Sequence, residues 1–202
     1  MKRFYEENKI EVGLDEAGRG CFFGPLCVAG VIMGDIESNP PPYPIKDSKK
    51  CSPKIRKILK EYIIENSISY HVQEIDSKTI DNINILQSTF KGMHMCIDEI
   101  CNQIDIDTIL VDGNMFPIYT TKDFIPINHI CIPKGDDKYI NIAAASILAK
   151  EYHDELISKI VSEDESLNKY DLLNNKGYGS KKHREAIKNY GLTNYHRKSF
   201  NI

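Results

Sequence analysis

The chain has 202 residues, of which 41% are hydrophobic and 27% charged, and its formal net charge is -3. This length suits a single domain with a full-sized core, and the charge balance excludes a protein that coats nucleic acid through bulk charge. No apolar run is long enough to cross a bilayer and the charged amino terminus lacks a signal-peptide apolar region, so we expect a cytoplasmic protein with no membrane role. The six cysteines show no C-x-x-C pairing and are expected to be reduced thiols.

Two strands are predicted first, over residues 9–15 and 25–33, because apolar residues dominate both segments and a Gly-Pro turn opens the second. We expect these strands to pair antiparallel. A proline-rich loop follows over residues 39–44. Ser52 is then a natural N-cap with Pro53 at the first helical position, and apolar residues recur at helical spacing after it, which predicts an amphipathic helix.

Strands and helices alternate through the rest of the chain. Periodicity predicts a strand over residues 67–75, a long helix over 80–103, and two further strands over 108–111 and 125–132. It then predicts a helix over 141–160 that opens with small residues, and a helical tail that contains residues 183–190. This order of elements, in which two strands come first and strands then alternate with helices, predicts an α/β fold with a mixed sheet. We expect residues 1–202 to form one domain and the protein to be a monomer.

A pair of adjacent carboxylates, Asp15 and Glu16, follows the first predicted strand and precedes Gly18, Arg19 and Gly20. Neighbouring strand residues point to opposite faces, so both carboxylates reach one ligand only if the strand ends or bulges at this point. The glycines are expected to supply that break. The guanidinium group of Arg19 can donate two parallel hydrogen bonds to phosphate oxygens. The alternative is an exposed acidic strand end followed by an ordinary loop.

Two further carboxylates, Asp112 and Asp136, follow a predicted strand and precede a predicted helix, respectively. If the sheet brings all four acids together, their mutual repulsion is tolerable only with cations bound. Oxygen ligands favour Mg²⁺ or Mn²⁺, and two such ions can activate a water and stabilise the leaving oxygen in phosphodiester cleavage. Taken singly, Asp112 is equally well read as a turn aspartate, and Asp136 as a solvated loop acid.

Eight segments in this order resemble the bacterial ribonuclease HII family, and the resemblance runs from about residue 10 to the end. They are Gly13-Leu14-Asp15-Glu16-Ala17-Gly18-Arg19-Gly20, Gly24-Pro25-Leu26, Asp47-Ser48-Lys49-Lys50, Val111-Asp112-Gly113-Asn114, Lys134-Gly135-Asp136, Ile142-Ala143-Ala144-Ala145-Ser146-Ile147-Leu148-Ala149-Lys150, Lys176-Gly177-Tyr178-Gly179 and His196-Arg197-Lys198-Ser199-Phe200. The resemblance implies a ribonuclease H-like mixed sheet flanked by helices, with a carboxy-terminal helical substrate-binding extension at about residues 165–202.

The resemblance also implies an activity and its residues. The family cuts the RNA strand of RNA/DNA hybrids and the 5′ side of a ribonucleotide embedded in duplex DNA, leaving 3′-hydroxyl and 5′-phosphate ends. The carboxylates named above, Asp15, Glu16, Asp112 and Asp136, are then the ligands of Mg²⁺ or Mn²⁺. By the same likeness, Gly18, Arg19 and Gly20 contact the 2′-hydroxyl and phosphate at the cleavage site, and Tyr178 packs on the sugar of the following deoxynucleotide. Basic side chains beside the family motifs are expected to contact phosphates; they are Lys49, Lys50, Lys181 and Lys182.

Several positions depart from the family pattern. Cys21-Phe22-Phe23 resembles the related ribonuclease HIII group, although Arg19 stands where that group usually has lysine. His153 replaces a usual arginine, and the loop between Asp112 and Asp136 is enlarged. A ribonuclease HIII-like hybrid-specific enzyme, a DNA-cutting nuclease of the same fold and a nucleic-acid-binding module therefore remain alternatives.

Two expectations concern the carboxy-terminal residues. His183, His196 and Arg197 are expected to be structural, and we assign them no part in the chemistry. The Asn201-Ile202 end contains no recognisable clamp-binding peptide.

Overall fold

A computed structural model of the protein describes residues 1–201; Ile202, and with it part of the segment considered for clamp binding, lies outside the described residues. One mixed sheet forms its centre, in the order β3-β2-β1-β4-β6-β5. The first three strands pair antiparallel, whereas β4 runs parallel to both β1 and β6. The strands are β1 (Glu11–Ala17), β2 (Leu26–Met33), β3 (Ser67–Ile75), β4 (Thr108–Asp112), β5 (Tyr119–Thr120) and β6 (Pro126–Ile132).

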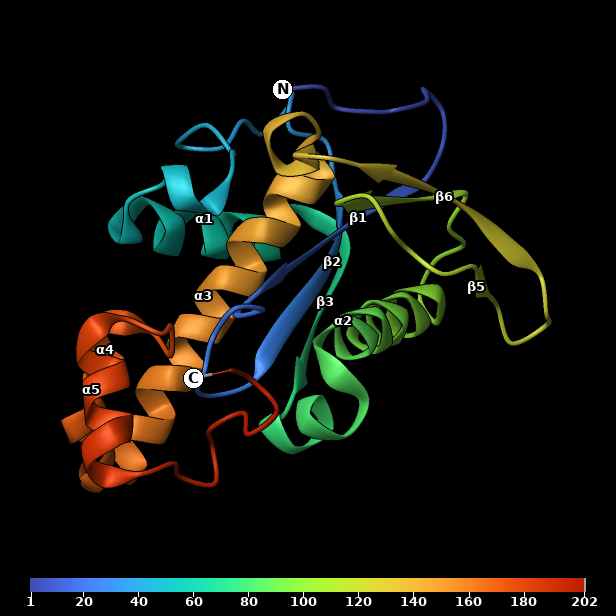
Figure 1. The fold of residues 1–202 in the computed structure, drawn as a ribbon. Helices are drawn as coiled ribbons and strands as arrows, with labels where there is room; N and C mark the ends of the chain where they lie inside the picture. Colours follow the sequence, from blue (N-terminus) through green and yellow to red (C-terminus); the bar gives the residue numbers. More distant parts are fainter. Residues whose placement is uncertain (202) are drawn as a thin grey trace.

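Helices cover both faces of this sheet. They are α1 (Pro53–Asn66), α2 (Ser77–Cys101), α3 (Ile140–Glu163), α4 (Leu172–Asn175) and α5 (Lys181–Tyr190), with short 3-10 turns η1 (Ser48–Lys50), η2 (Gly135–Asp137) and η3 (Glu165–Tyr170). Figure 1 shows α2 on one face and α1 with α3 on the other. Side chains on a strand alternate between faces, so Val28 packs in the α2 layer while Ala29 packs in the α3 layer. The mixed α/β fold predicted from the sequence is confirmed.

Helix α3 lies unusually close to the sheet at its amino-terminal end. A side chain at Gly13 in β1 would meet the backbone of Asn141 in α3 at 2.3 Å, so the strand has no room for a Cβ there. The small residues at the start of α3 permit this approach. Asn141 then joins two strands, because its side-chain amide accepts a hydrogen bond from the Met33 amide at 3.1 Å and donates one to the Glu11 carbonyl at 2.5 Å.

Strand β1 continues past the point where the sequence predicted its end. Asp15 pairs with Ala29, and the register with β2 runs on without a bulge to the end of the strand at Ala17. The expected break at Asp15 is therefore wrong. The chain turns only at Gly18, whose φ of +85° lies in the left-handed region that glycine tolerates best.

Two other elements differ from expectation for local reasons. Helix α2 starts three residues earlier than predicted and kinks at Asn84, where φ is 64°. The Asn84 side chain accepts a hydrogen bond from the Gln87 amide at 3.0 Å and so caps the second part of the helix. The enlarged loop before β6 contains the two-residue strand β5, which is too short for a periodic signal. Within the described residues, no helix is long and apolar enough to span a membrane.

The carboxy-terminal elements pack on the second half of α3, as Figure 1 shows at α4 and α5. The segment that departs from the family pattern lies at this junction. Cys21 forms a backbone bridge with Tyr178, and Phe23 forms one with His196. Phe23 is fully buried against Ile157 of α3. The two aromatic residues after Cys21 therefore join the turn after β1 to the carboxy-terminal elements.

Candidate active site

Three of the four predicted acids meet at one edge of the sheet. Asp15, Asp112 and Asp136 each place a carboxylate oxygen within 4.8 Å of the others. Strands β1 and β4 are parallel neighbours with Leu14 opposite Val111, so the next residue on each strand, Asp15 or Asp112, arrives at the same edge. Strand β6 lies beside β4 and leads into η2, which carries Asp136.

Backbone contacts fix the Asp112 carboxylate and the turn that carries Asp136. Oδ1 of Asp112 accepts a hydrogen bond from the Gly135 amide at 2.7 Å, which joins the end of β4 to η2. The turn into η2 is set by Lys134, whose φ of 56° is left-handed. Gly135 has no space for a side chain, because a Cβ there would lie 2.6 Å from Ile142 Cδ1.

The three carboxylates crowd together in a negatively charged environment, in which Asp15 and Asp136 are buried and Asp112 is partly buried. Burial, followed by the charges of Glu16 and Asp112, raises the pKa of Asp15 well above its usual value. Burial and then the charge of Asp112 raise the pKa of Asp136 to about 6. Among residues 1–201, no lysine, arginine or histidine forms an ion pair with any of the three. Crowded, oxygen-only donors of this kind fit a divalent cation of the magnesium class.

Glu16 is close to this group without belonging to it. Because β1 remains regular, Glu16 points away from Asp15, and its Oε1 lies 3.3 Å from the Arg19 guanidinium. Burial raises the pKa of Glu16, Arg19 opposes that shift, and Asp112 adds to it. The structure therefore brings Glu16 to the edge of the carboxylate cluster, where the negative charge of Asp112 is near enough to raise its pKa.

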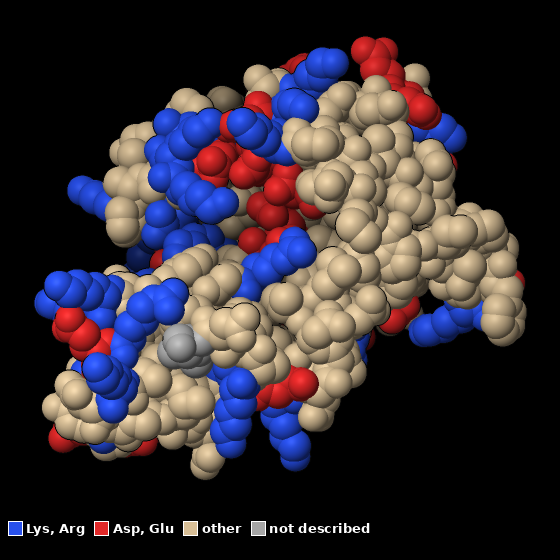
Figure 2. Space-filling model, in the orientation of Figure 1, with Lys and Arg blue, Asp and Glu red and all other residues tan. Residues whose placement is uncertain are grey.

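A pocket of about 470 Å³ opens beside the cluster. Glycine, cationic, hydroxyl and aromatic groups line it together with two of the acids: Asp15, Glu16, Ala17, Gly18, Arg19, Gly20, Ser48, Lys49, Ser146, Lys150 and Tyr178. The predicted glycines, Arg19, Lys49 and Tyr178 thus gather at one place. Figure 2 shows acidic side chains in a hollow of the molecular surface, with lysines and arginines around them.

Three polar pocket residues were not singled out from the sequence. Ser48 and Ser146 are buried side by side, with 3.0 Å between their hydroxyl oxygens. Lys150 holds its ammonium group 2.8 Å from Asp154 and 5.5 Å from the centre of the Tyr178 ring. All three lie inside the motifs quoted above, so the motifs could have pointed to them. The sequence alone did not tell which residues of those motifs face the pocket.

Other predicted phosphate contacts lie outside the pocket. Lys50 forms an ion pair with Asp137 at 2.5 Å and so links η1 to η2. Lys181 and Lys182 are on α5, with side chains 91% and 77% exposed, and each lies 3.9 Å from an acid. Such exposed pairs are weak, so these two ammonium groups stay accessible to a ligand.

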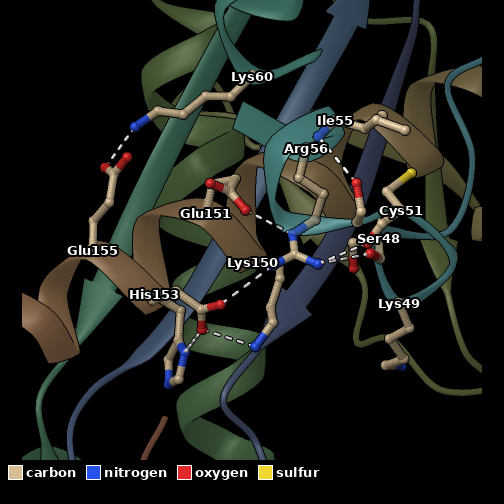
Figure 3. A network of polar contacts seen from close by, with 12 residues as sticks. Ser48, Lys49, Cys51, Ile55, Arg56, Lys60, Lys150, Glu151, His153 and Glu155 are labelled. Carbon is tan, nitrogen blue, oxygen red and sulfur yellow. Dashed lines mark hydrogen bonds and ion pairs between the residues drawn. The ribbon is translucent and has the colours of Figure 1, made fainter. Parts of the chain in front are cut away.

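A buried arginine holds the loop that carries Lys49. Arg56 of α1 donates from Nε to Glu151 of α3 at 2.6 Å and from Nη1 to the carbonyls of Ser48 and Cys51 at 3.2 and 3.0 Å. Figure 3 shows this network between α1, α3 and the loop, with Lys49 extending away from it. Because these hydrogen bonds attach η1 to both α1 and α3, the backbone of Lys49 is held in place beside the pocket.

The raised pKa of Asp136 predicts how metal-free protein responds to pH. A carboxyl whose pKa rises on folding, here from 3.8 to about 6, stabilises the fold below its unfolded pKa and loses that contribution as pH rises through about 6. Asp136→Asn removes this penalty. In EDTA, its gain in unfolding free energy over the wild type should be larger at about pH 7.5 than at about pH 4.5, by about 1 to 2 kcal/mol. Urea unfolding measures both values, and an equal gain at the two pH values would contradict the electrostatic account.

Comparison with known proteins gives consistent matches over the full length. The family model for ribonuclease HII matches residues 12–202. Ribonuclease HII of Cytophaga hutchinsonii is 43% identical over 98% of this chain and 93% of that protein. Ribonuclease HII of Christiangramia forsetii is 45% identical over 100% and 96%, respectively. Among solved structures, ribonuclease HII of Archaeoglobus fulgidus in its complex with PCNA has a TM-score of 0.71, with 26% identity over 96% of each chain.

Proposed function

This chain belongs to the ribonuclease HII family, and we propose that it cuts the RNA strand of RNA/DNA hybrids and nicks duplex DNA 5′ of an embedded ribonucleotide. Family membership makes it a metal-dependent ribonuclease H that acts on RNA/DNA substrates. The finer specificity is supported by one observation: the carboxylate cluster and a pocket lined by Gly18, Arg19, Gly20 and Tyr178 lie side by side. We propose that water attacks the phosphorus and that the bond to the 3′ oxygen breaks, with a proton passing to that oxygen, which leaves 3′-hydroxyl and 5′-phosphate ends.

Asp15, Asp112 and Asp136 are the proposed metal ligands, with Glu16 as the fourth acid of the site. The fit rests on three clustered carboxylates, two of them buried, that form no ion pair among the described residues. When bound, two Mg²⁺ or Mn²⁺ ions would activate the attacking water and stabilise the leaving oxygen. The parallel pairing of β1 with β4 and the hydrogen bond from the Gly135 amide to Asp112 set where these oxygens lie at the sheet edge.

The pocket residues would recognise the ribose and the phosphate. The turn at Gly18 and Gly20 lets backbone amides approach a ligand closely, and the 2′-hydroxyl is the group that distinguishes RNA from DNA. Arg19 is half exposed and lies 3.3 Å from Glu16, so its guanidinium is placed at the boundary between the acids and an incoming phosphate. Tyr178 is 39% exposed, which leaves a ring face free to pack on the next sugar.

The remaining lysines would position the duplex. Lys49 lines the pocket, and Lys181 and Lys182 project from α5. Lys50 supports the site through its ion pair with Asp137 and would reach phosphate only by leaving that pair. Phosphate contacts of this kind set the register of a duplex without reading its sequence. We propose that the chain works as a monomer of one domain, in which the extension at about residues 165–202 carries Tyr178.

A panel of labelled duplexes tests this function. Purified protein with Mg²⁺ or Mn²⁺ is given a DNA duplex with one ribonucleotide, an RNA/DNA hybrid and an all-DNA duplex. We expect a nick 5′ of the single ribonucleotide, cleavage of the hybrid, and intact DNA. Cleavage of the hybrid alone would favour the ribonuclease HIII-like alternative, whereas cleavage of the all-DNA duplex would favour a DNA nuclease.

Tyr178→Ala tests recognition of the junction between RNA and DNA. Removing the ring takes away its packing on the deoxynucleotide sugar, so the ratio of kcat/KM for the single ribonucleotide to that for the all-RNA strand should fall about 10-fold. Tyr178→Phe is the matched control, because it keeps the ring face and loses only the hydroxyl; its ratio should stay near that of the wild type. An unchanged ratio in Tyr178→Ala would remove the junction-sensing role.

A further inference from the structure

Two buried histidines lie directly behind Tyr178. His183 of α5 and His196 of the carboxy-terminal turn are 0% and 1% exposed, and their Nε2 atoms are 3.1 Å apart. On its other side, His183 places Nδ1 2.9 Å from the carbonyl oxygen of Tyr178, which also accepts a hydrogen bond from the Ser180 amide at 2.8 Å. His196 places its Nδ1 2.9 Å from the Thr193 amide nitrogen and 2.8 Å from the Thr193 hydroxyl oxygen, which can donate to the same atom. A continuous row of hydrogen bonds thus runs from the carboxy-terminal turn to the candidate junction residue.

The partners at the two ends fix the direction of every bond in the row. The Thr193 amide can only donate, so Nδ1 of His196 is the acceptor and its proton lies on Nε2. The Tyr178 carbonyl can only accept, so His183 carries its proton on Nδ1. In the neutral pair, Nε2 of His196 therefore donates to Nε2 of His183. No other arrangement of the two tautomers satisfies both ends.

The surroundings keep both rings neutral. The ring of Phe23 stands edge-on to His196 at 5.1 Å, and the Tyr170 ring contacts both histidines at 5.0 and 6.1 Å. No ion pair among the described residues involves either imidazole. Burial, with the neighbouring imidazole second, lowers the pKa of His196 to about 4. A second proton on His183 would place two donors against each other between the two histidines. A second proton on His196 would instead oppose the Thr193 amide, which also donates.

The row also reaches the turn that follows β1. The backbone bridge between Phe23 and His196 attaches the histidine to the strand-like segment just after Gly20. The Tyr178 backbone is held on its other side as well, since its amide donates to the Asn175 carbonyl at 3.0 Å. Both walls of the pocket, the Gly18–Gly20 turn and Tyr178, are thus connected through this pair.

We infer that His183 and His196 are positioning residues for Tyr178, which they hold through a neutral imidazole pair with the two tautomers stated above. The inference rests on the proposed role of Tyr178 at the RNA-to-DNA junction. The pair touches no reacting atom. Its effect is to keep the Tyr178 ring at the pocket wall, so it should govern the choice between substrates more than the rate on an all-RNA strand.

The first test reads the tautomers directly. Nitrogen NMR of the imidazoles in the full-length protein at neutral pH should show His196 protonated at Nε2 alone and His183 protonated at Nδ1 alone. The opposite tautomer in either ring, or a doubly protonated ring, would overturn the inference. This measurement does not depend on what Tyr178 does with a substrate.

The second test separates the hydrogen bond from packing. His196→Phe keeps an aromatic ring but cannot donate to His183, so the preference for the single ribonucleotide over the all-RNA strand should fall about 3- to 10-fold. The kcat on the all-RNA strand should stay within about twofold of the wild type. His196→Gln restores a donor at the Nε2 position and should recover most of the preference. Equal preference in the Phe and Gln variants would overturn the inference.

A second pair of variants covers the case in which His196→Phe does not fold. His183→Asn retains a donor toward the Tyr178 carbonyl, whereas His183→Leu does not, so only the leucine variant should lose preference. Tyr178→Ala is measured alongside. If Tyr178→Ala leaves the preference unchanged, the proposed junction role fails by itself. If Tyr178→Ala lowers it and both histidine series do not, the positioning inference fails alone.

Discussion

Asp112→Asn is expected to lower kcat/KM on the single-ribonucleotide duplex by at least about 10³-fold, because a neutral amide replaces a carboxylate on which several kcal/mol of metal-assisted catalysis depend. Asp112 lies between the other two acids of the cluster, and its charge raises the pKa of both. The fold should survive, since the asparagine oxygen can still accept the hydrogen bond from the Gly135 amide. Single-turnover kinetics with Mg²⁺ give the rate.

Two companion measurements make this result specific. Without metal, Asp112→Asn should be more stable than the wild type, because one of three repelling charges has been removed. Asp123→Asn is the matched control: Asp123 is an exposed acid in the loop before β6, and its loss should leave activity unchanged. Full activity in Asp112→Asn, or an equal loss in Asp123→Asn, would remove Asp112 from the site.

Arg197→Ala is expected to destabilise the protein by about 3 to 5 kcal/mol, since it leaves buried polar groups without partners. Arg197 is fully buried and donates to three carbonyl oxygens, those of Gly24, Arg19 and Pro25, at 3.1, 3.0 and 3.0 Å. Burial lowers its pKa to about 10, so the side chain remains charged at neutral pH. It connects the carboxy-terminal segment to both ends of the turn after β1. Urea unfolding measures the loss.

Two variants separate geometry from charge at this position. Arg197→Lys keeps the cation but cannot reach three divergent carbonyls, so it should recover only part of the lost stability. Lys198→Ala changes the exposed neighbour and should shift the unfolding free energy by less than about 0.5 kcal/mol. If Arg197→Ala unfolds at the same urea concentration as the wild type, the three carbonyls do not depend on Arg197.

Local patterns predicted the elements and the chemistry of the acids. The Ser52-Pro53 start gave helix α1, and its cap is confirmed by the hydrogen bond from the Ile55 amide to the serine hydroxyl. Asp15, Asp112 and Asp136 were linked in advance because strand ends tend to place ligands at one edge of an α/β sheet. Their roles as metal ligands stay a prediction.

Long-range pairing decided what local patterns could not. The glycines after Glu16 suggested a break at Asp15, but hydrogen bonds to β2 keep β1 regular as far as Ala17. Glu16 consequently faces away from Asp15. The sequence predicted that these two strands pair antiparallel, but it did not report the register, which carries the pairing of β1 past Asp15 to Ala17.

The contacts of the carboxy-terminal segment were also invisible in the sequence. Arg197 reaches backbone carbonyls more than 170 residues away along the chain, and backbone acceptors carry no side-chain signature. His183 and His196 were expected to be structural, and their shared hydrogen bond appears only when α5 meets the final turn. Phe22 and Phe23, which depart from the family pattern, pack at that meeting point.

Mapping the cut in a duplex with one ribonucleotide tests the central claim most directly. The claim is that the acid cluster and the adjacent pocket together direct a metal-dependent nick to the 5′ side of the ribose. With Mg²⁺ or Mn²⁺, we predict one nick at that phosphodiester, a 3′-hydroxyl that a DNA polymerase extends without further treatment, and no cleavage in EDTA. A cut at another bond, a 3′ end that cannot be extended, or equal cleavage in EDTA would contradict the account.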